Sequence, residues 1–350
     1  MIYRNAAEAF SAKLAELMST GSDIRVRGSL TKELNHQTVV LTTPLERCIV
    51  IPHRRNNVFA TIVESVWVIA GRNDLQLLTP YLPRAVDFSD DGSTWRAGYG
   101  PRLRNWHGVD QVAAVERILQ ASPESRQGVL SLFDPALDFV SSKDIPCTNW
   151  LHFIIRNGAL DLNVAVRSND IVWGFSGINT FEWSILQEMM AFWLGAAVGK
   201  TTYHISSLHL YERHFERARR ILEAAPSSNP YDQAPPRARF STAIEDLPLV
   251  LDSWFQVESK IRSGAVTRDE IASFPDPLLR DFLRVLHYYW TRQRTPSAHP
   301  ESLLSNVEDA ALASAAINHF RTEQPGNLGF RATFSSSDEP AATRSVSSAG

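Results

Sequence analysis

Apolar residues recur with a helical period along much of this chain. Between residues 2 and 18, Ala6, Phe10, Leu14 and Leu17 fall on one side of a helix. The stretch 183–198 is the most apolar and contains Glu188, so we predict that it belongs to a buried core helix. The same periodicity predicts helices at 58–70, 109–120, 180–194, 214–224, 247–263, 276–292 and 306–321.

Short β-rich segments lie between these helices. Within 38–52 we expect strands at 39–41 and 48–51, and we expect others at 129–133, 150–156, 160–166 and 203–210. The dipeptide Asn157-Gly158 predicts a hairpin between two of them. This order of elements predicts an α/β (α+β) fold, with a large mixed or antiparallel sheet packed on a long central helix at 180–194.

A change in composition near residue 226 suggests how the chain is organised. Its 350 residues can bury a large core, as one domain or two. Residues 226–240 are rich in proline and serine and are predicted to form a loop. We predict a catalytic core at 1–225, a helical C-terminal extension of the same domain at 241–330, and a disordered tail at 331–350.

Composition and charge exclude several classes of protein. The net charge of −3 gives no basic field for nucleic acid, and no apolar run reaches the ~18 residues of a membrane span. Charged residues interrupt the N-terminal segment too early for a signal peptide. Two cysteines exclude a disulfide framework and a four-cysteine zinc site. We therefore predict a cytoplasmic protein with no metal, membrane or nucleic-acid partner.

The chemistry-bearing residues gather around Cys147. It follows Pro146, and the run Arg167-Ser168-Asn169-Asp170 begins 20 residues after it. A thiolate suits the covalent activation of a pyrimidine ring, because sulfur is both a good nucleophile and a good leaving group. The alternative is a buried structural cysteine, which is our interpretation of Cys48 in its apolar segment.

Seven motifs occur in an order that resembles the thymidylate synthase superfamily, which includes pyrimidine nucleotide hydroxymethylases. The resemblance runs from about residue 24 to residue 214. Its landmarks are the helix from Glu64 to Gly71, Tyr99-Gly100, Asp110-Gln111, Ser125-Arg126-Gln127, Pro146-Cys147, Arg167-Ser168-Asn169-Asp170 with Asn179, and His209-Leu210-Tyr211.

The resemblance implies the following roles. Cys147 adds to C6 of a pyrimidine nucleoside monophosphate, Glu64 organises a water, and Tyr99 helps to remove the C5 proton. A one-carbon unit comes from the co-substrate 5,10-methylenetetrahydrofolate, which Asp170 binds. The residues implied to bind the nucleotide are Arg27, Arg126, Arg167, Ser168, Asn179, His209 and Tyr211.

A homodimer is also implied, in which each subunit lends Arg126 to the phosphate site of the other. The chain departs from the family pattern at Gln127, where a second arginine is common.

The product and the base are the open questions. Synthases commonly screen the C5 methylene with a tryptophan in the segment at 81–88, which has none here, and close the site with a tail unlike residues 347–350. Thr148 stands where a histidine is common. We therefore predict 5-hydroxymethylation of CMP or dCMP. The alternatives are a thymidylate synthase that converts dUMP to dTMP with release of dihydrofolate, and a non-catalytic nucleotide-binding relative.

Asn179 keeps dUMP open as a substrate, because its amide matches uracil and aspartate is the family's mark of cytosine. The segment from Asp170 to Asn179 is one residue longer than in the synthases.

Overall fold

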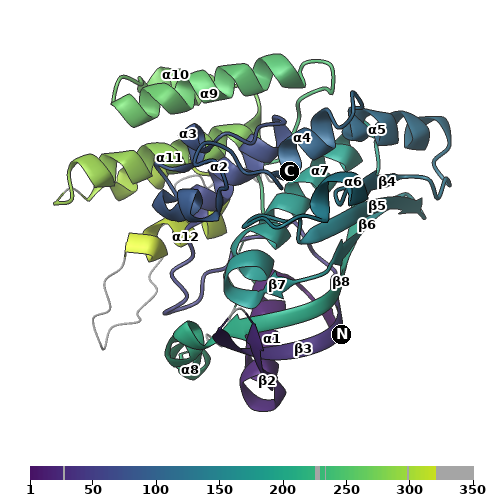
Figure 1. Ribbon diagram of the computed structural model, residues 1–350. Coiled ribbons are helices and arrows are strands. Elements are labelled where there is room, and N and C mark those ends of the chain that lie inside the picture. Colours follow the sequence, from purple (N-terminus) through teal and green to yellow (C-terminus); the bar gives the residue numbers. More distant parts are fainter. Residues whose placement is uncertain (27, 225–228, 233, 298, 321–350) are drawn as a thin grey trace, which may run out of the picture.

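A single mixed sheet lies along one side of the molecule in the computed structural model, which describes residues 1–320 except 27, 225–228, 233 and 298 (Figure 1). The strand order is β1-β3-β8-β6-β5-β4, with β2 paired to β3 and β7 paired to β8. The strands are β1 (Ile2–Tyr3), β2 (Ser22–Val26), β3 (Ser29–Leu41), β4 (Val129–Ser131), β5 (Thr148–Arg156), β6 (Ala159–Val166), β7 (Asn169–Asp170) and β8 (Ala197–Tyr211).

The sheet combines antiparallel and parallel pairs. β8 runs antiparallel to β3 and parallel to β6, while β5 and β6 form an antiparallel hairpin. Asn157 and Gly158 at the tip of this hairpin have φ values of 52° and 75°, the backbone that such a tight turn requires. The predicted mixed sheet and the predicted hairpin are both confirmed.

Helix α7 (Thr180–Trp193) is the buried centre of the helical layer. Every residue from Thr180 to Ala191 is buried, and the helix packs on β6 and β8 on one side and on α2 (Val58–Ile69) on the other. The predicted central helix is therefore confirmed. A π-helix, η2 (Ile171–Asn179), leads directly into it.

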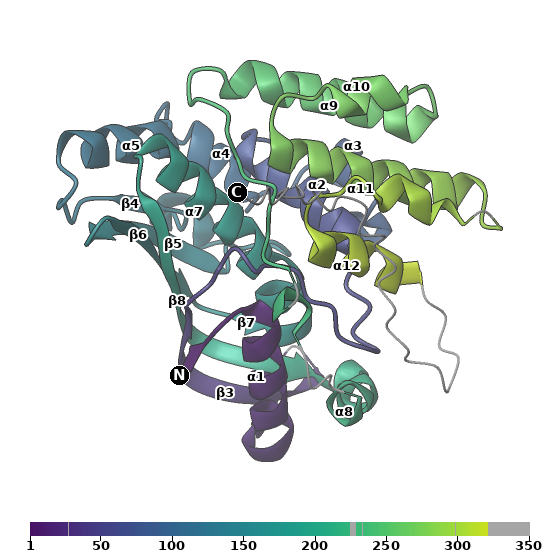
Figure 2. The same cartoon turned by 180° about the vertical axis from the view of Figure 1, so that it is seen from behind.

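The C-terminal helices form a separate layer over α2 and α3 (Leu75–Leu78), as Figures 1 and 2 show. We call residues 247–320 the helical extension. Tyr81 links it to the rest of the molecule, because its hydroxyl donates to Glu258 at 2.6 Å and accepts from Trp290 Nε1 at 2.8 Å. Its helices are α9 (Leu247–Ser263), α10 (Arg268–Ala272), η5 (Pro300–Leu304), α11 (Pro277–Arg294) and α12 (Ala310–Phe320).

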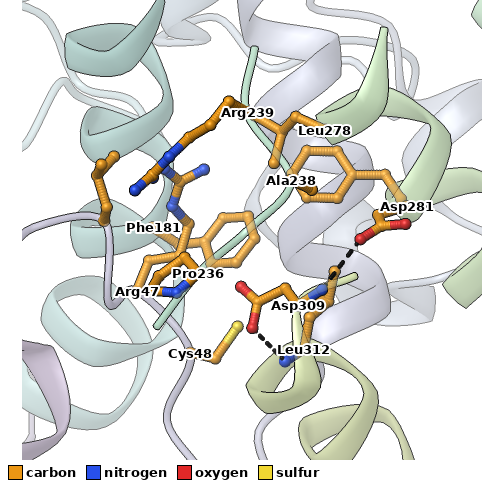
Figure 3. Close-up of a pocket in the computed structure, with 12 residues that line it drawn as sticks. Arg47, Cys48, Phe181, Pro236, Ala238, Arg239, Leu278, Asp281, Asp309 and Leu312 are labelled. Atoms are coloured by element: carbon orange, nitrogen blue, oxygen red, sulfur yellow. Dashed lines mark hydrogen bonds between the residues drawn. The ribbon is translucent and has the colours of Figure 1, made fainter. Parts of the chain in front are cut away.

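A small cavity with a mostly apolar lining lies where the helical extension meets α7 and the segment around Cys48 (Figure 3). Its volume is about 10 Å³, near the lower limit for one water molecule. Arg47 and Arg239 approach from one side and Asp309 from the other.

One predicted element is wrong, and one begins at a different residue. Residues 48–51 do not form a strand, although Cys48, Ile49 and Ile51 are buried. The N–H of Cys48 donates instead to the hydroxyl of Tyr231 at 3.0 Å, so a distant side chain replaces a neighbouring strand. The first helix, α1 (Ala6–Thr20), begins later than predicted, since residues 2–3 pair with β3.

Of β3, only the last part was predicted, at 39–41. Helices α5 and α8 match predicted helices, whereas the other helices in the following list were not predicted. The remaining helices are η1 (Pro83–Phe88), α4 (Tyr99–Arg104), α5 (Gln111–Ala121), α6 (Pro135–Asp138), η3 (Glu212–His214), α8 (Phe215–Glu223) and η4 (Pro230–Asp232). The predicted tail at 331–350 lies outside the described residues.

Candidate active site

Cys147 lies at the start of β5, beside a guanidinium that the backbone holds in place. Its half-buried Sγ atom is 3.8 Å from Nη2 of Arg167. The Arg167 side chain also donates to the carbonyls of Pro146 at 2.8 Å and Ile145 at 2.9 Å. A fixed positive charge next to the sulfur stabilises its thiolate form, which is the nucleophile. Ser168, the next residue, is half-buried between β6 and β7.

Tyr99 reaches the same place from the first turn of α4. Its hydroxyl accepts a hydrogen bond of 2.9 Å from the N–H of Thr148, the residue after Cys147. Burial raises the pKa of Tyr99, and the neighbouring Cys147 thiol adds to the effect. One turn further along α4, the buried Arg102 donates to both carboxylate oxygens of Asp138 and anchors the helix.

Glu64 lies on α2, and all the remaining residues of this helix are buried. Burial raises the pKa of Glu64 to about 8, and the charge of Asp144 contributes. The carboxyl group therefore exchanges its proton near neutral pH, where a general acid or base is most effective.

The π-helix η2 contains the extra residue between Asp170 and Asn179, because its wider turns take up one more residue than an α-helix does. Asp170 caps it, as Oδ1 accepts from the N–H groups of Val172 at 2.7 Å and Trp173 at 3.0 Å. Gly174 is required inside it, since an added Cβ would lie 2.2 Å from Oδ1 of Asn169.

The predicted base and sugar residues come from two neighbouring elements. Asn179 ends η2, is 5% exposed, and its carbonyl accepts from the hydroxyl of Tyr203 at 3.5 Å. His209 and Tyr211 lie on β8 with ring centroids 5.3 Å apart, and His209 pairs in register with Asp170 of β7. Burial lowers the pKa of His209, although the charge of Asp170 opposes the shift. The imidazole is therefore neutral at pH 7 and both donates and accepts hydrogen bonds.

Two predicted phosphate ligands stand apart from this group. Arg126 is exposed, and its guanidinium forms no hydrogen bond or ion pair with any other described residue. Its backbone carbonyl faces the ring of His152 at 3.1 Å. Arg27 lies outside the described residues.

The tryptophan-free segment at 81–88 forms η1 and the residues that lead into it. Its only fully buried small side chain is Ala85, whose carbonyl accepts from Nε1 of Trp95 at 2.9 Å. Trp95 packs edge-on against Trp67, one turn after Glu64, with ring centroids 5.7 Å apart. The sequence analysis did not consider this tryptophan.

Glu182 was also missed by the sequence analysis. It lies one turn after Asn179 on α7, is 1% exposed, and neither of its carboxylate oxygens has a hydrogen-bond partner among the described residues. Burial raises its pKa well above the usual range, the charge of Glu64 adds to this, and Asn179 offsets it only in part. The position of Glu182 one turn after Asn179 is the sequence signal that would have identified it.

The sequence model of the thymidylate synthase family matches residues 8–250. The chain belongs to the thymidylate synthase family. The match ends near the start of α9, so almost all of the helical extension lies beyond it.

Relatives of this chain include proteins of phages and of Methanothermobacter. A deoxyuridylate hydroxymethyltransferase of Bacillus phage SP01 is 36% identical over 210 residues, which cover 57% of this chain and 55% of that relative. A protein of the same name from Delftia phage PhiW-14 is 27% identical over 319 residues, 85% of this chain and 88% of the relative. A putative thymidylate synthase of Methanothermobacter marburgensis is 33% identical over 220 residues, 62% of this chain and 95% of the relative. The match to the SP01 protein thus spans about half of that relative's length.

The described residues offer neither a metal-binding cluster nor a membrane-crossing helix. They contain no cluster of three or more His, Cys, Asp or Glu side chains able to hold a metal ion. No helix in this part of the chain combines the length and apolarity that crossing a bilayer requires.

Proposed function

We propose that this protein is a folate-dependent hydroxymethylase that acts on C5 of dUMP. The observation that carries the proposal is the amide of Asn179, which is buried where η2 leads into α7. An amide donates to one position of uracil and accepts from its neighbour, as a carboxylate does not. The names of the phage relatives support the same base and the same reaction. The proposal thus prefers dUMP to the cytidine nucleotides expected from the sequence.

The reaction begins at the sulfur. The Cys147 thiolate, stabilised by Arg167, adds to C6 of the base and makes C5 nucleophilic. C5 then takes a one-carbon unit from 5,10-methylenetetrahydrofolate. Tyr99 and Glu64 transfer the C5 proton through water, for which the raised pKa of Glu64 is suited. Loss of the C5 proton expels tetrahydrofolate and leaves an exocyclic methylene on C5. Water attacks this methylene, and expulsion of the sulfur from C6 restores the ring.

The side chains beside η2 fit a folate. Asp170 uses Oδ1 to cap the π-helix, and Oδ2 takes part in neither of these bonds. A carboxylate oxygen there accepts from the N–H groups of a pterin ring. The indole of Trp173 is 45% exposed three residues further on and offers a flat apolar surface. We propose that this edge of the site binds the co-substrate.

An assay with four nucleotides tests the proposal. The enzyme is incubated with dUMP, dCMP, UMP or CMP, together with 5,10-methylenetetrahydrofolate in water labelled with oxygen-18. We expect 5-hydroxymethyl-dUMP that carries the label, tetrahydrofolate as the second product, and no rise in dihydrofolate absorbance. Turnover of dCMP in preference to dUMP would contradict the assignment of the base.

The second candidate is a thymidylate synthase. It is favoured by the archaeal putative thymidylate synthase, of which the matched segment covers 95%. The same assay distinguishes it, since a synthase releases 5-methyl-dUMP and dihydrofolate and incorporates no oxygen from water.

We also propose a homodimer in which Arg126 completes the partner's phosphate site. The support is its exposed guanidinium, which has no partner among the described residues of its own chain. Mixing Cys147→Ser subunits with Arg126→Ala subunits gives heterodimers with one intact site. Random exchange should then restore roughly a quarter of the wild-type activity, because isologous dimers share both sites. A monomer in sedimentation, or no recovery on mixing, would contradict this.

A further inference from the structure

Glu182 is a buried acid that the steps above do not use. It is 1% exposed, and both carboxylate oxygens lack a hydrogen-bond partner among the described residues. Burying such a group without a partner is unfavourable by roughly 1–3 kcal/mol or more. A native protein retains such a group where a ligand or an ordered water satisfies it.

The position of Glu182 directs it toward the reacting nucleotide. It lies one turn after Asn179 on α7, so the two side chains share a helix face. Opposite them, Thr61 of α2 donates to the carbonyl of Gly177 at 2.7 Å and fixes the two elements together. Glu64 lies one turn after Thr61 on α2. Both carboxylates therefore approach the same space from two packed helices.

The electrostatic effects agree with this geometry. The charge of Glu64 raises the pKa of Glu182, and the charge of Glu182 in turn raises the pKa values of Tyr99 and Tyr203. Two desolvated carboxyl groups at short range do not both ionise at neutral pH, so the pair keeps at least one proton.

We propose that Glu182 is the catalytic base for hydration, which holds and deprotonates the water that attacks the C5 methylene of the nucleotide. This inference rests on the proposed hydroxymethylase function. Glu64 serves the earlier removal of the C5 proton. The roles are thus divided between two acids, one for each proton transfer.

The step is balanced in atoms and electrons. The water oxygen bonds to the methylene carbon, and one water proton passes to the carboxylate of Glu182. The electron pair of the C5–methylene double bond moves onto the ring as an enolate. It then returns to form the C5–C6 double bond while the C6–S bond breaks, and Cys147 leaves as a thiolate. No oxidant or reductant takes part.

The experiment measures how the methylene intermediate divides between two nucleophiles. Wild type and Glu182→Gln are incubated with dUMP tritiated at C5, 5,10-methylenetetrahydrofolate and 2-mercaptoethanol. Tritium release reports loss of the C5 proton, and the two products are the hydroxymethyl nucleotide and the thioether formed by the added thiol. A thiol provides its own thiolate and needs no protein base.

Glu182→Gln should lower the ratio of hydroxymethyl to thioether product about 100-fold, the usual contribution of a general base. Tritium release should stay within about threefold of wild type, because the earlier steps do not need the base. Glu188→Gln is the matched control, since it makes the same change six residues further along the same buried helix and should leave the ratio unchanged.

Each result decides between the alternatives. An unchanged ratio in Glu182→Gln overturns the inference while the hydroxymethylase function stands. An altered preference between dUMP and dCMP at an unchanged ratio assigns Glu182 to base recognition instead. If wild type forms only the 5-methyl nucleotide and dihydrofolate, the proposed function itself fails. Glu182→Asp, which draws the carboxylate back by one methylene, should lower the ratio by a smaller factor. If the glutamine variant does not fold, a wild-type ratio in Glu182→Asp overturns the inference.

Discussion

The two ends of helix α7 bury the same residue type in opposite surroundings. Near its C-terminal end, Glu188 pairs with the buried Arg47 and accepts from the N–H of Phe240 at 3.2 Å. Arg239 adds a second positive charge at 3.9 Å. Near the N-terminal end, Glu182 is equally buried and has no cation beside it among the described residues. The amide of Asn179 is close enough to lower its pKa, but neither carboxylate oxygen has a partner at hydrogen-bond geometry.

The difference separates a structural carboxylate from one prepared for a ligand. The Glu188 carboxylate is paired with Arg47 and bonded to the segment at 239–240, although Nε and Nη1 of Arg47 have no partner among the described residues. Asp276 behaves in the same way, since it accepts from Ser241 N and Thr242 Oγ1, both at 2.8 Å. At the other end the protein leaves hydrogen-bonding capacity unused, which is typical of a site that a substrate or water completes.

The largest effect is a loss of turnover, which we expect in the candidate active site. Cys147→Ser should reduce turnover at least ~1000-fold, because a hydroxyl does not ionise enough at neutral pH to add to C6. The melting temperature should change little, since Sγ is only half-buried. Initial rates and a thermal melt on the same preparation check both parts. Substantial residual product would rule out the covalent mechanism.

Around Glu188 we expect a substitution to reduce stability. Arg47→Ala should reduce the free energy of unfolding by about 3–5 kcal/mol, because it leaves a buried carboxylate without its cation. Urea unfolding of the wild type and the variant provides the measurement. Arg239→Ala is the matched control, since its side chain is 47% exposed and 3.9 Å from Glu188. That variant should lose less than about 1 kcal/mol. Equal losses in both variants would show that Arg47 acts by packing alone.

A pH series sharpens the comparison further. The pKa of Glu64 is about 8 in the folded protein, so the folded chain keeps a proton that the unfolded chain releases near pH 4.5. The stability that this proton contributes is fully present below pH 4.5 and is lost as the pH rises through 8. Glu64→Gln has no such dependence. Its melting temperature should therefore exceed that of wild type by a margin that grows between pH 5 and pH 8. Parallel curves for the two proteins would contradict the raised pKa.

The sequence predicted regular elements better than it predicted local environment. Helix α9 occupies 247–263 as expected, because its amphipathic period ends at Gly264, which has a φ of 81° that favours glycine. The strand expected at 48–51 failed, since a distant residue, Tyr231, satisfies the backbone of that apolar run. Apolar content alone does not distinguish these two ways of burying a segment.

The candidate site shows the same limit. The motifs led to Cys147, Arg167 and Tyr99, which the structure brings together. Glu182 was overlooked because, in the sequence, it resembles Glu188: each is an acid in an apolar helix. The two residues differ only in the partners that other elements contribute. Glu188 has Arg47, and the oxygens of Glu182 have no hydrogen-bond partner among the described residues.

The smallest effect is expected at Asp170, which joins a structural and a binding role in one side chain. Asp170→Asn keeps the oxygen that caps η2, so the free energy of unfolding should change by less than about 1 kcal/mol. His209 is neutral at pH 7 with or without the neighbouring charge, since burial already lowers its pKa. The dissociation constant for dUMP should therefore stay within about twofold of wild type. The KM for 5,10-methylenetetrahydrofolate should rise about tenfold, because the lost charge weakens the bond to the pterin. Asp170→Ala, which also removes the cap, should show the same KM effect together with a further loss of about 1 kcal/mol in stability. Weaker dUMP binding with an unchanged folate KM would instead assign Asp170 to the nucleotide, and the folate would then bind elsewhere in the site.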